Sequence, residues 1–133
     1  MINQVVTRQF FYFSIVGTVG FVVDSSVLYA VVYWVGLNHY SGRLLSYICA
    51  VTVTWYLNRN FTFKSRSEKL FKEWIKFAYT NLLGAFVNVG SYSLLVLLSP
   101  IVYKHPLIGV ATGSVLGLAV NFIASKKFVF RND

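Results

Sequence analysis

The amino-acid sequence predicts an all-α integral membrane protein with four transmembrane helices, arranged as two parallel-repeat helical hairpins with both termini in the cytoplasm. Composition is the first reason, because the chain of 133 residues is 56% hydrophobic and only 12% charged. Soluble domains usually carry about a quarter charged residues. The second reason is that the cations gather in a few hydrophilic stretches, and the third is an internal repeat. A bilayer is the solvent in which so apolar a chain can bury its surface.

Four apolar segments follow one another along the chain, separated by polar turns. They cover residues 10–36, 40–57, 74–98 and 107–124. At about 1.5 Å per helical residue, each approaches or exceeds the thickness of a hydrocarbon core of about 30 Å. The first segment is too long for a cleaved signal peptide and contains an acid, Asp24. The third ends before Pro100, because proline interrupts helices.

The distribution of lysine and arginine predicts the orientation in the membrane. Ten cations lie in the N-terminal stretch, the middle loop or the C-terminal stretch, namely Arg8, Arg59, Lys64, Arg66, Lys69, Lys72, Lys76, Lys126, Lys127 and Arg131. Arg43 and Lys104 lie on the opposite side. The positive-inside rule therefore places both termini and the loop of residues 58–72 in the cytoplasm. Near the end of this loop, Phe71 and Trp74 suggest a short helix lying at the membrane interface.

The two halves of the sequence resemble each other. Phe13, Gly20 and Asp24 recur 64 positions later as Phe77, Gly84 and Asn88, and Phe61, Phe63 and Lys64 recur 67 positions later as Phe128, Phe130 and Arg131. Each half contains two apolar segments, so both halves enter the membrane in the same direction, as a parallel repeat about an axis along the membrane normal. We therefore expect one domain over residues 1–133, built from hairpins over residues 8–64 and 72–131.

Polar side chains inside the apolar segments need partners or a function, since a charge at mid-bilayer costs about 2.5–3.5 kcal/mol. Asp24 and Arg43 lie roughly 21 and 22 Å from the cytoplasmic ends of their helices, at about 1.5 Å per residue. We therefore predict an ion pair between them, which either neutralises the two charges or contributes to function. Asn88 and Asn121 are expected to form interhelical hydrogen bonds or to contact a substrate.

The basic sequences at the cytoplasmic ends of the second and fourth segments are candidate phosphate sites. Asn58 and Arg59 precede one Phe-x-Phe sequence, and Lys126 and Lys127 precede the other. Cations beside aromatic residues at a helix end suit a phosphate-bearing lipid headgroup. They also suit ordinary snorkelling toward the membrane surface.

A stripe of glycines in the fourth segment is a candidate helix-packing face. Gly109, Gly113 and Gly117 are spaced four residues apart, which is the small-xxx-small pattern of membrane helix interfaces. Four spans leave little room to enclose a headgroup. We therefore expect a homodimer or a larger oligomer, and the glycine stripe is a candidate face for the dimer.

The sequence contains no recognisable catalytic or cofactor site. The single cysteine, Cys49, excludes an internal disulfide framework and a Cys-based zinc site, and His39 and His105 lie in outer turns. No glycine-rich phosphate loop, paired carboxylates or nucleophile with a base is present. We therefore expect no metal, no cofactor and no catalysis. We also expect no nucleic-acid binding, because membrane topology explains the positive charge.

Together the motifs resemble the GtrA-like family of four-span membrane proteins over about residues 8–131. The resemblance rests on the sequence from Phe13 to Asp24, on Leu57-Asn58-Arg59-Asn60-Phe61-Thr62-Phe63, and on the similar sequence from Asn121 to Phe130. Asp24 matches the acid of the family's first span, and Asn58-Arg59 match its polar-basic step. Ser125 departs from the family, which often has Asn in the second step.

The resemblance implies a flippase that moves a polyprenyl-phosphate-linked monosaccharide across the bacterial cytoplasmic membrane, beside a polyprenyl-phosphate glycosyltransferase, for cell-surface polysaccharide glycosylation. The phosphate would first meet the cations of the two basic ends, Arg59, Lys126 and Lys127. Arg43 would receive it nearer the outside, and the sugar would pass Asp24, Asn88 and Asn121. Two alternatives stay open: a small multidrug-resistance-like exporter that exchanges protons at Asp24, and a non-transporting membrane anchor for a glycosyltransferase.

Overall fold

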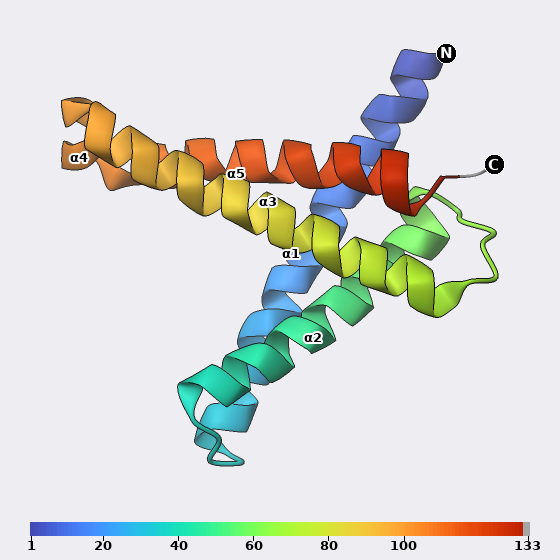
Figure 1. Ribbon diagram of the computed structural model, residues 1–133, viewed down its shortest axis with the longest axis horizontal. Coiled ribbons are helices and arrows are strands. Elements are labelled where there is room, and N and C mark those ends of the chain that lie inside the picture. Colours follow the sequence, from blue (N-terminus) through green and yellow to red (C-terminus); the bar gives the residue numbers. More distant parts are fainter. Residues whose placement is uncertain (132–133) are drawn as a thin grey trace. The chain divides into compact units, whose positions relative to one another are not determined.

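The structure, a computed structural model, describes residues 1–131 of the chain. All regular structure in that part is helical, as the sequence predicted: α1 (Ile2–Tyr33), α2 (His39–Leu57), η1 (Asn58–Thr62), α3 (Leu70–Leu98), α4 (Pro100–Lys104), α5 (Pro106–Ala124) and η2 (Ser125–Val129) (Figure 1). The chain forms two compact units, which we call unit 1 (Met1–Leu70) and unit 2 (Phe71–Arg131).

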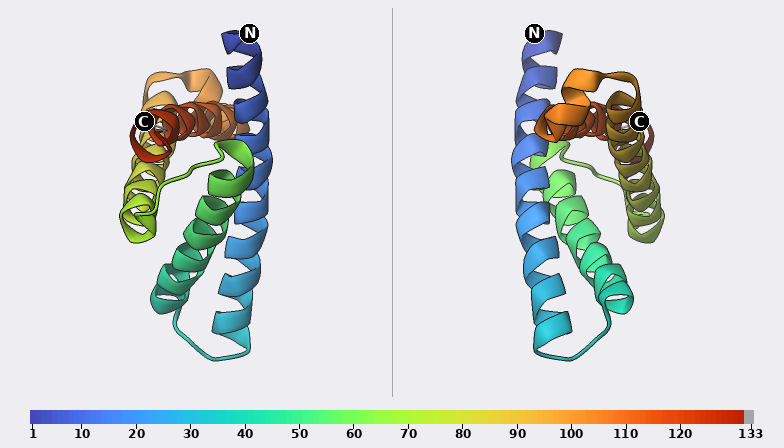
Figure 2. Two further views of the ribbon diagram at one scale, coloured as in Figure 1. Left: turned by 90° about the vertical axis from the view of Figure 1, so that its right-hand side faces the viewer. Right: turned by 90° about the vertical axis from the view of Figure 1, so that its left-hand side faces the viewer.

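Unit 1 is an antiparallel pair of long helices, α1 and α2, that lie side by side (Figures 1 and 2). The turn between them uses Gly36, whose φ of 86° lies in the left-handed region that glycine adopts at little cost. Asn38 then caps α2, because its side-chain oxygen accepts a hydrogen bond from the Ser41 N–H at 2.8 Å. The two predicted segments agree with these helices, although α1 already begins at Ile2.

Unit 2 contains α3 and α5, also antiparallel, with the short helix α4 between them (Figure 1). The sequence did not predict α4, in which Ser99 is the cap and Pro100 takes the first position, where its missing N–H has no helical partner to lose. The expectation of a separate interfacial helix around Phe71 and Trp74 is wrong. Both residues belong to the first turns of α3, which runs without interruption because no proline occurs between Leu70 and Leu98.

Both α2 and α5 end in a π-helical turn, η1 and η2. The Phe63 N–H donates to the Asn58 carbonyl, and the Phe130 N–H donates to the Ser125 carbonyl, each at 2.9 Å. The two turns are 67 positions apart, which is the offset of the predicted repeat. The two basic ends therefore share an uncommon backbone conformation. Such π-turns are rare in proteins and often occur at functional sites.

Residues at equivalent positions of the repeat are buried in both units. The buried face of α1 has Phe13, Val16 and Gly20, and that of α3 has Phe77, Thr80 and Gly84, each 64 residues later. The buried face of α2 has Gly42, Ser46 and Ala50, and that of α5 has Gly109, Gly113 and Gly117, each 67 residues later. The contacts within each unit thus follow the register of the sequence repeat.

Glycines on α3 and α5 bring the two backbones into contact. A Cβ added to Gly117 would lie 2.7 Å from the Gly84 carbonyl oxygen, and a Cβ on Gly84 would lie 3.0 Å from the Gly117 carbonyl oxygen. A Cβ on Gly113 would lie 2.6 Å from the Asn88 carbonyl oxygen. The glycine stripe of α5 therefore packs against α3 of its own chain. Its interpretation as a homodimer face is wrong, because no room is left there for another helix.

Three helices in residues 1–131 are long and apolar enough to cross a membrane: Ile2–Tyr33, Leu70–Leu98 and Pro106–Val129. The helix α2 is not among them, since its 19 residues include polar side chains such as Arg43 and Ser46. Four spans, the hairpin arrangement across the bilayer and the cytoplasmic location of both termini therefore stay predictions.

Replacing Gly117 with alanine should destabilise unit 2, because the new Cβ would overlap the Gly84 carbonyl, a backbone group that cannot rotate away. Overpacking of this kind usually costs about 1–3 kcal/mol. Thermal unfolding in detergent should therefore occur at a lower temperature for G117A. Gly90→Ala is the matched control, since nothing lies within 4 Å of its Cβ position. Equal losses in both variants would contradict the close approach of the backbones.

Candidate functional site

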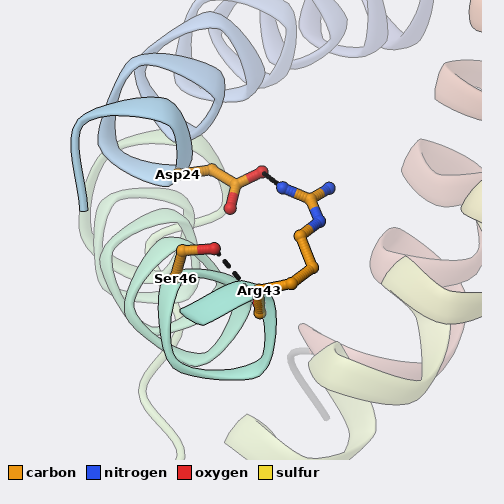
Figure 3. Close-up of polar contacts among 3 residues, drawn as sticks. All are labelled: Asp24, Arg43 and Ser46. Atoms are coloured by element: carbon orange, nitrogen blue, oxygen red, sulfur yellow. Dashed lines mark hydrogen bonds and ion pairs between the residues drawn. The ribbon is translucent and has the colours of Figure 1, made fainter. Parts of the chain in front are cut away.

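An ion pair joins the two helices of unit 1. Nη1 of Arg43, on α2, donates to Oδ2 of Asp24, on α1, at 2.5 Å (Figure 3). Ser46, which is fully buried, donates its hydroxyl to the Arg43 carbonyl oxygen at 3.0 Å. The ion pair predicted from the sequence is thus confirmed, because the two antiparallel helices bring the charges to the same level.

The two members of the pair differ in exposure. The Asp24 side chain is 17% exposed, and its Oδ1 is buried without a hydrogen-bond partner among residues 1–131. The Arg43 side chain is 60% exposed, and in the same part of the chain Asp24 alone accepts a hydrogen bond from its guanidinium. The carboxylate is therefore enclosed between the helices, whereas the guanidinium reaches out from them (Figure 3).

A chain of amide hydrogen bonds connects α3 and α5 in unit 2. Nδ2 of Asn121 donates to Oδ1 of Asn81 at 3.2 Å, and Nδ2 of Asn81 donates to the Phe77 carbonyl at 3.0 Å. The expectation that Asn121 bridges helices is confirmed, but its partner Asn81 was missed. The available signal was spacing: Asn81 precedes Asn88 by seven residues and therefore shares its helix face.

Unit 2 has no charged residue at the sequence positions equivalent to Asp24 and Arg43. Asn88 and Val110 occupy the positions of unit 2 that are equivalent to Asp24 and Arg43. Asn88 packs against α5, since its Oδ1 lies 2.8 Å from the place where a Cβ on Gly113 would be. Unit 2 therefore offers hydrogen-bonding groups where unit 1 offers two opposite charges.

Buried polar residues support the two basic ends from inside. Asn58 is only 2% exposed, and its Oδ1 accepts a hydrogen bond from the Thr62 hydroxyl at 2.7 Å. At the equivalent position of unit 2, Ser125 is fully buried with its hydroxyl oxygen 3.3 Å from that of Thr80. The position of Asn58 gives no support to its predicted contact with a lipid phosphate. Its amide stabilises η1 instead.

The aromatic residues of the basic ends alternate between the interior and the surface. Phe63 contacts Phe13 with ring centroids 6.1 Å apart, and Phe130 contacts Phe77 at 5.6 Å. Phe63 and Phe130 are buried, so each anchors its basic end to the first helix of its own unit. The exposed members are Phe61 and Phe128.

The three cations of the basic ends have different environments. Arg59 is half-buried, and it donates from Nη2 to the Ser67 carbonyl at 2.6 Å and from Nη1 to the Ser65 hydroxyl at 3.4 Å. It therefore holds the loop that follows η1. Lys126 is half-buried and Lys127 is exposed. Of the three, Lys127 is the most accessible to a ligand at the surface.

A buried acid, Glu73, was missed in the sequence. The residue is 3% exposed and lies one turn before Phe77 on the inner face of α3. The signal was again spacing, because Glu73, Phe77, Thr80 and Gly84 follow one another at intervals of three or four residues. The acid therefore continues a stripe that is otherwise recognisable as internal.

Within residues 1–131, no group of three or more His, Cys, Asp or Glu side chains is arranged to hold a metal ion. The described residues offer cations near the helix ends and hydrogen-bonding groups between the helices of each unit. Such groups can bind a ligand that combines an anion with several hydroxyls.

Comparison with known proteins gives two findings. Residues 12–131 match the family described as the GtrA/DPMS transmembrane domain. The chain is also 26% identical over 130 residues to a bactoprenol-linked glucose translocase from Shigella flexneri, and the alignment covers 98% of both chains. The similarity therefore extends through both units and both π-turns.

Replacing Asn58 with alanine should destabilise the protein, because the buried Thr62 hydroxyl would lose its acceptor. An unmet buried hydrogen-bonding group costs about 1–3 kcal/mol. Asn60→Ala is a control of the same residue type, since Asn60 is exposed and its side-chain amide donates to the nearby Tyr56 carbonyl at 2.8 Å. Thermal unfolding in detergent should show a clear loss for N58A and little for N60A. The reverse order would show that this amide does not stabilise η1.

Proposed function

Because the chain belongs to the GtrA/DPMS transmembrane-domain family, we propose that it translocates a polyprenyl-phosphate-linked monosaccharide across the bacterial cytoplasmic membrane. The observation that carries this proposal is the similarity to a bactoprenol-linked glucose translocase over 98% of both chains. The sugar would then be added to a cell-surface polysaccharide. The protein is a multi-pass membrane protein, and its role in this proposal is to bind and move the lipid, not to alter it chemically.

We propose that α2 is the fourth span. Its 19 residues correspond to about 28 Å at 1.5 Å per residue, close to the hydrocarbon thickness of about 30 Å. Tyr40 and Tyr56 are 90% and 58% exposed near its two ends, where tyrosines often mark the membrane surfaces. Pairing with Asp24 also neutralises Arg43, the one arginine or lysine of α2. Both units then begin and end on the cytoplasmic side.

In the first step, the lipid phosphate is captured at the cytoplasmic ends of the units. Lys126 and Lys127 belong to η2, and Arg59 belongs to η1. Cations at the surface of a membrane attract lipid phosphate. Asn58 takes part indirectly, because it stabilises the turn that carries Arg59.

In the second step, the sugar passes polar groups within the membrane while the polyprenyl tail stays in lipid. Asn88 and Asn121 of unit 2 and Asp24 of unit 1 are the groups we assign to this step. Amides and carboxylates can exchange hydrogen bonds with sugar hydroxyls, which would otherwise cross the bilayer unpaired. Arg43 then receives the phosphate near the other surface, since it lies at the opposite end of α2 from Arg59.

The contacts of Asp24 argue against a proton-coupled exporter of the small multidrug-resistance type. In such an exporter the carboxylate must be open to a cationic drug, whereas Arg43 already occupies it at 2.5 Å. A polyprenyl-phosphate glycosyltransferase, which attaches the sugar to the lipid phosphate, stays in the proposal as a partner, with an oligomer of this chain as a further possibility. A membrane anchor without transport activity would bind that partner and move no lipid.

Neutralising the two lysines of η2 should slow translocation. Each basic residue near an anionic surface contributes about 1 kcal/mol, so K126Q/K127Q should lower the rate roughly tenfold or more at limiting substrate. The assay uses purified protein in vesicles and measures the transfer of a short-chain polyprenyl-phosphate glucose between leaflets. The control R66Q/K69Q removes two exposed loop cations and should stay close to the unchanged protein. Equal rates for both double variants would exclude η2 from the path of the substrate.

Labelling of single cysteines tests the proposed topology. In a Cys49→Ser background, cysteine replaces one exposed residue at a time: His39, Arg66 or Lys104. A membrane-impermeant maleimide should label H39C and K104C in intact cells, and R66C only after the membrane is opened. Labelling of H39C and R66C from the same side would show that α2 does not cross.

A further inference from the structure

Aromatic side chains lie one to three turns beyond Asp24, near the end of α1. Tyr29, Tyr33 and Trp34 are 58%, 66% and 80% exposed near the end of α1. Such clusters lie where acyl chains meet headgroups. Asp24 precedes Tyr29 by five residues, or roughly 7 Å along the axis. Under the proposed topology, the long side chain of Arg43 can therefore reach the headgroups of the outer leaflet.

The guanidinium of Arg43 uses one of its donors and leaves the others open. Of the five N–H groups of an arginine, those on Nε and Nη2 have no partner within residues 1–131, while Nη1 donates to Asp24. The Asp24 contact holds the planar group at one corner, and its second terminal nitrogen points away from the carboxylate (Figure 3). The open edge has the fork shape that binds two oxygens of one phosphate.

Resting on the proposed function, we propose that this open edge binds the phosphate of a lipid headgroup at the outer surface, and that Asp24 keeps the binding weak enough for release. A phosphate arriving at Arg43 meets a guanidinium whose charge is already balanced by a carboxylate 2.5 Å away. A lone arginine would attract the same phosphate more strongly, because no neighbouring carboxylate would offset its positive charge. A transporter must release its substrate, so excessive affinity on the outer side would slow turnover.

Comparison of the two units supports a specific role for the pair. The equivalent positions in unit 2 are Asn88 and Val110, which carry no charge, although the helices there pack in the same register. The pair is therefore not required for this type of helix packing. Its exposed member also distinguishes it from an ion pair that only neutralises two buried charges, since Arg43 is 60% exposed.

The variant Asp24→Asn separates the charge of Asp24 from its contact with Arg43. Asparagine has nearly the same shape, and its side-chain oxygen can still accept from Nη1, so the orientation of the guanidinium is kept. Removal of the negative charge should increase the affinity of Arg43 for phosphate on the order of tenfold. Asp24→Ala removes the charge and the contact together, and it should gain less affinity than D24N because the guanidinium loses its orientation.

Binding is measured by titrating the purified protein in detergent with farnesyl phosphate, using uncharged farnesol as the reference. A K126Q/K127Q background keeps phosphate binding at η2 from masking the effect. We expect D24N to bind farnesyl phosphate more tightly, and R43Q and D24N/R43Q to be equally weak. Lys104→Gln controls for the loss of a cation predicted on the same side and should leave binding unchanged. Affinity in folded D24N that equals or falls below that of the parent would overturn the proposal.

Two further measurements identify the lipid and the role in transport. Displacement of farnesyl phosphate by a polyprenyl-phosphate hexose but not by phosphatidylglycerol would assign the site to the substrate. Equal displacement by both would assign it to bulk lipid and overturn its link with transport.

In vesicles, D24N with the lysines of η2 intact should translocate several-fold more slowly than the unchanged protein, and an equal rate would overturn the release role. Absence of translocation by the unchanged protein would instead refute the proposed function, while the comparison of D24N and R43Q still decides whether the phosphate site exists.

Discussion

Close contact between two helix backbones is the constraint on which each unit depends. Lipid tails are as apolar as leucine, so burial of apolar side chains gives little reason for helices to associate in a bilayer. Small residues favour helix association in a bilayer, because they let the backbones and short side chains of two helices come into van der Waals contact. In unit 2, Gly84 and Gly117 place each carbonyl against the other helix. In unit 1, Gly20 receives the Thr54 methyl group in a space that no Cβ could share.

The same packing produces different chemistry in the two units. The buried residues Phe13 and Gly20 recur unchanged as Phe77 and Gly84, but the polar positions between the helices differ. Unit 1 has the Asp24–Arg43 ion pair, while unit 2 has an amide, Asn88, and an apolar residue, Val110, at the equivalent sequence positions. The two units therefore share one helix packing but offer different groups: an ion pair in unit 1 and hydrogen-bonding amides in unit 2. This division suits a ligand that has both a sugar and a phosphate.

The ends of the units show how buried residues determine the positions of surface cations. Phe63 and Phe130 anchor η1 and η2 against the first helix of each unit, and Asn58 and Ser125 fill the interior behind them. Because a π-turn widens the helix by one residue, the following side chains are displaced around the axis compared with an α-helix. Lys127 is exposed in the turn that these buried residues anchor.

From its sequence alone, this chain was recognisable as helical and apolar, with an internal repeat and a charged pair at matching depth. These features follow from composition and from spacing along single helices, and Asp24 and Arg43 could be matched by counting residues. The partners of the small residues could not be read in this way, because a glycine stripe fits any close helix. The tertiary structure decided that Gly113 and Gly117 meet α3 and that Asn58 faces inward. It also revealed the roles of Asn81 and Glu73. Their burial depends on a neighbouring helix, and the spacing of residues along one helix does not specify which helix that is.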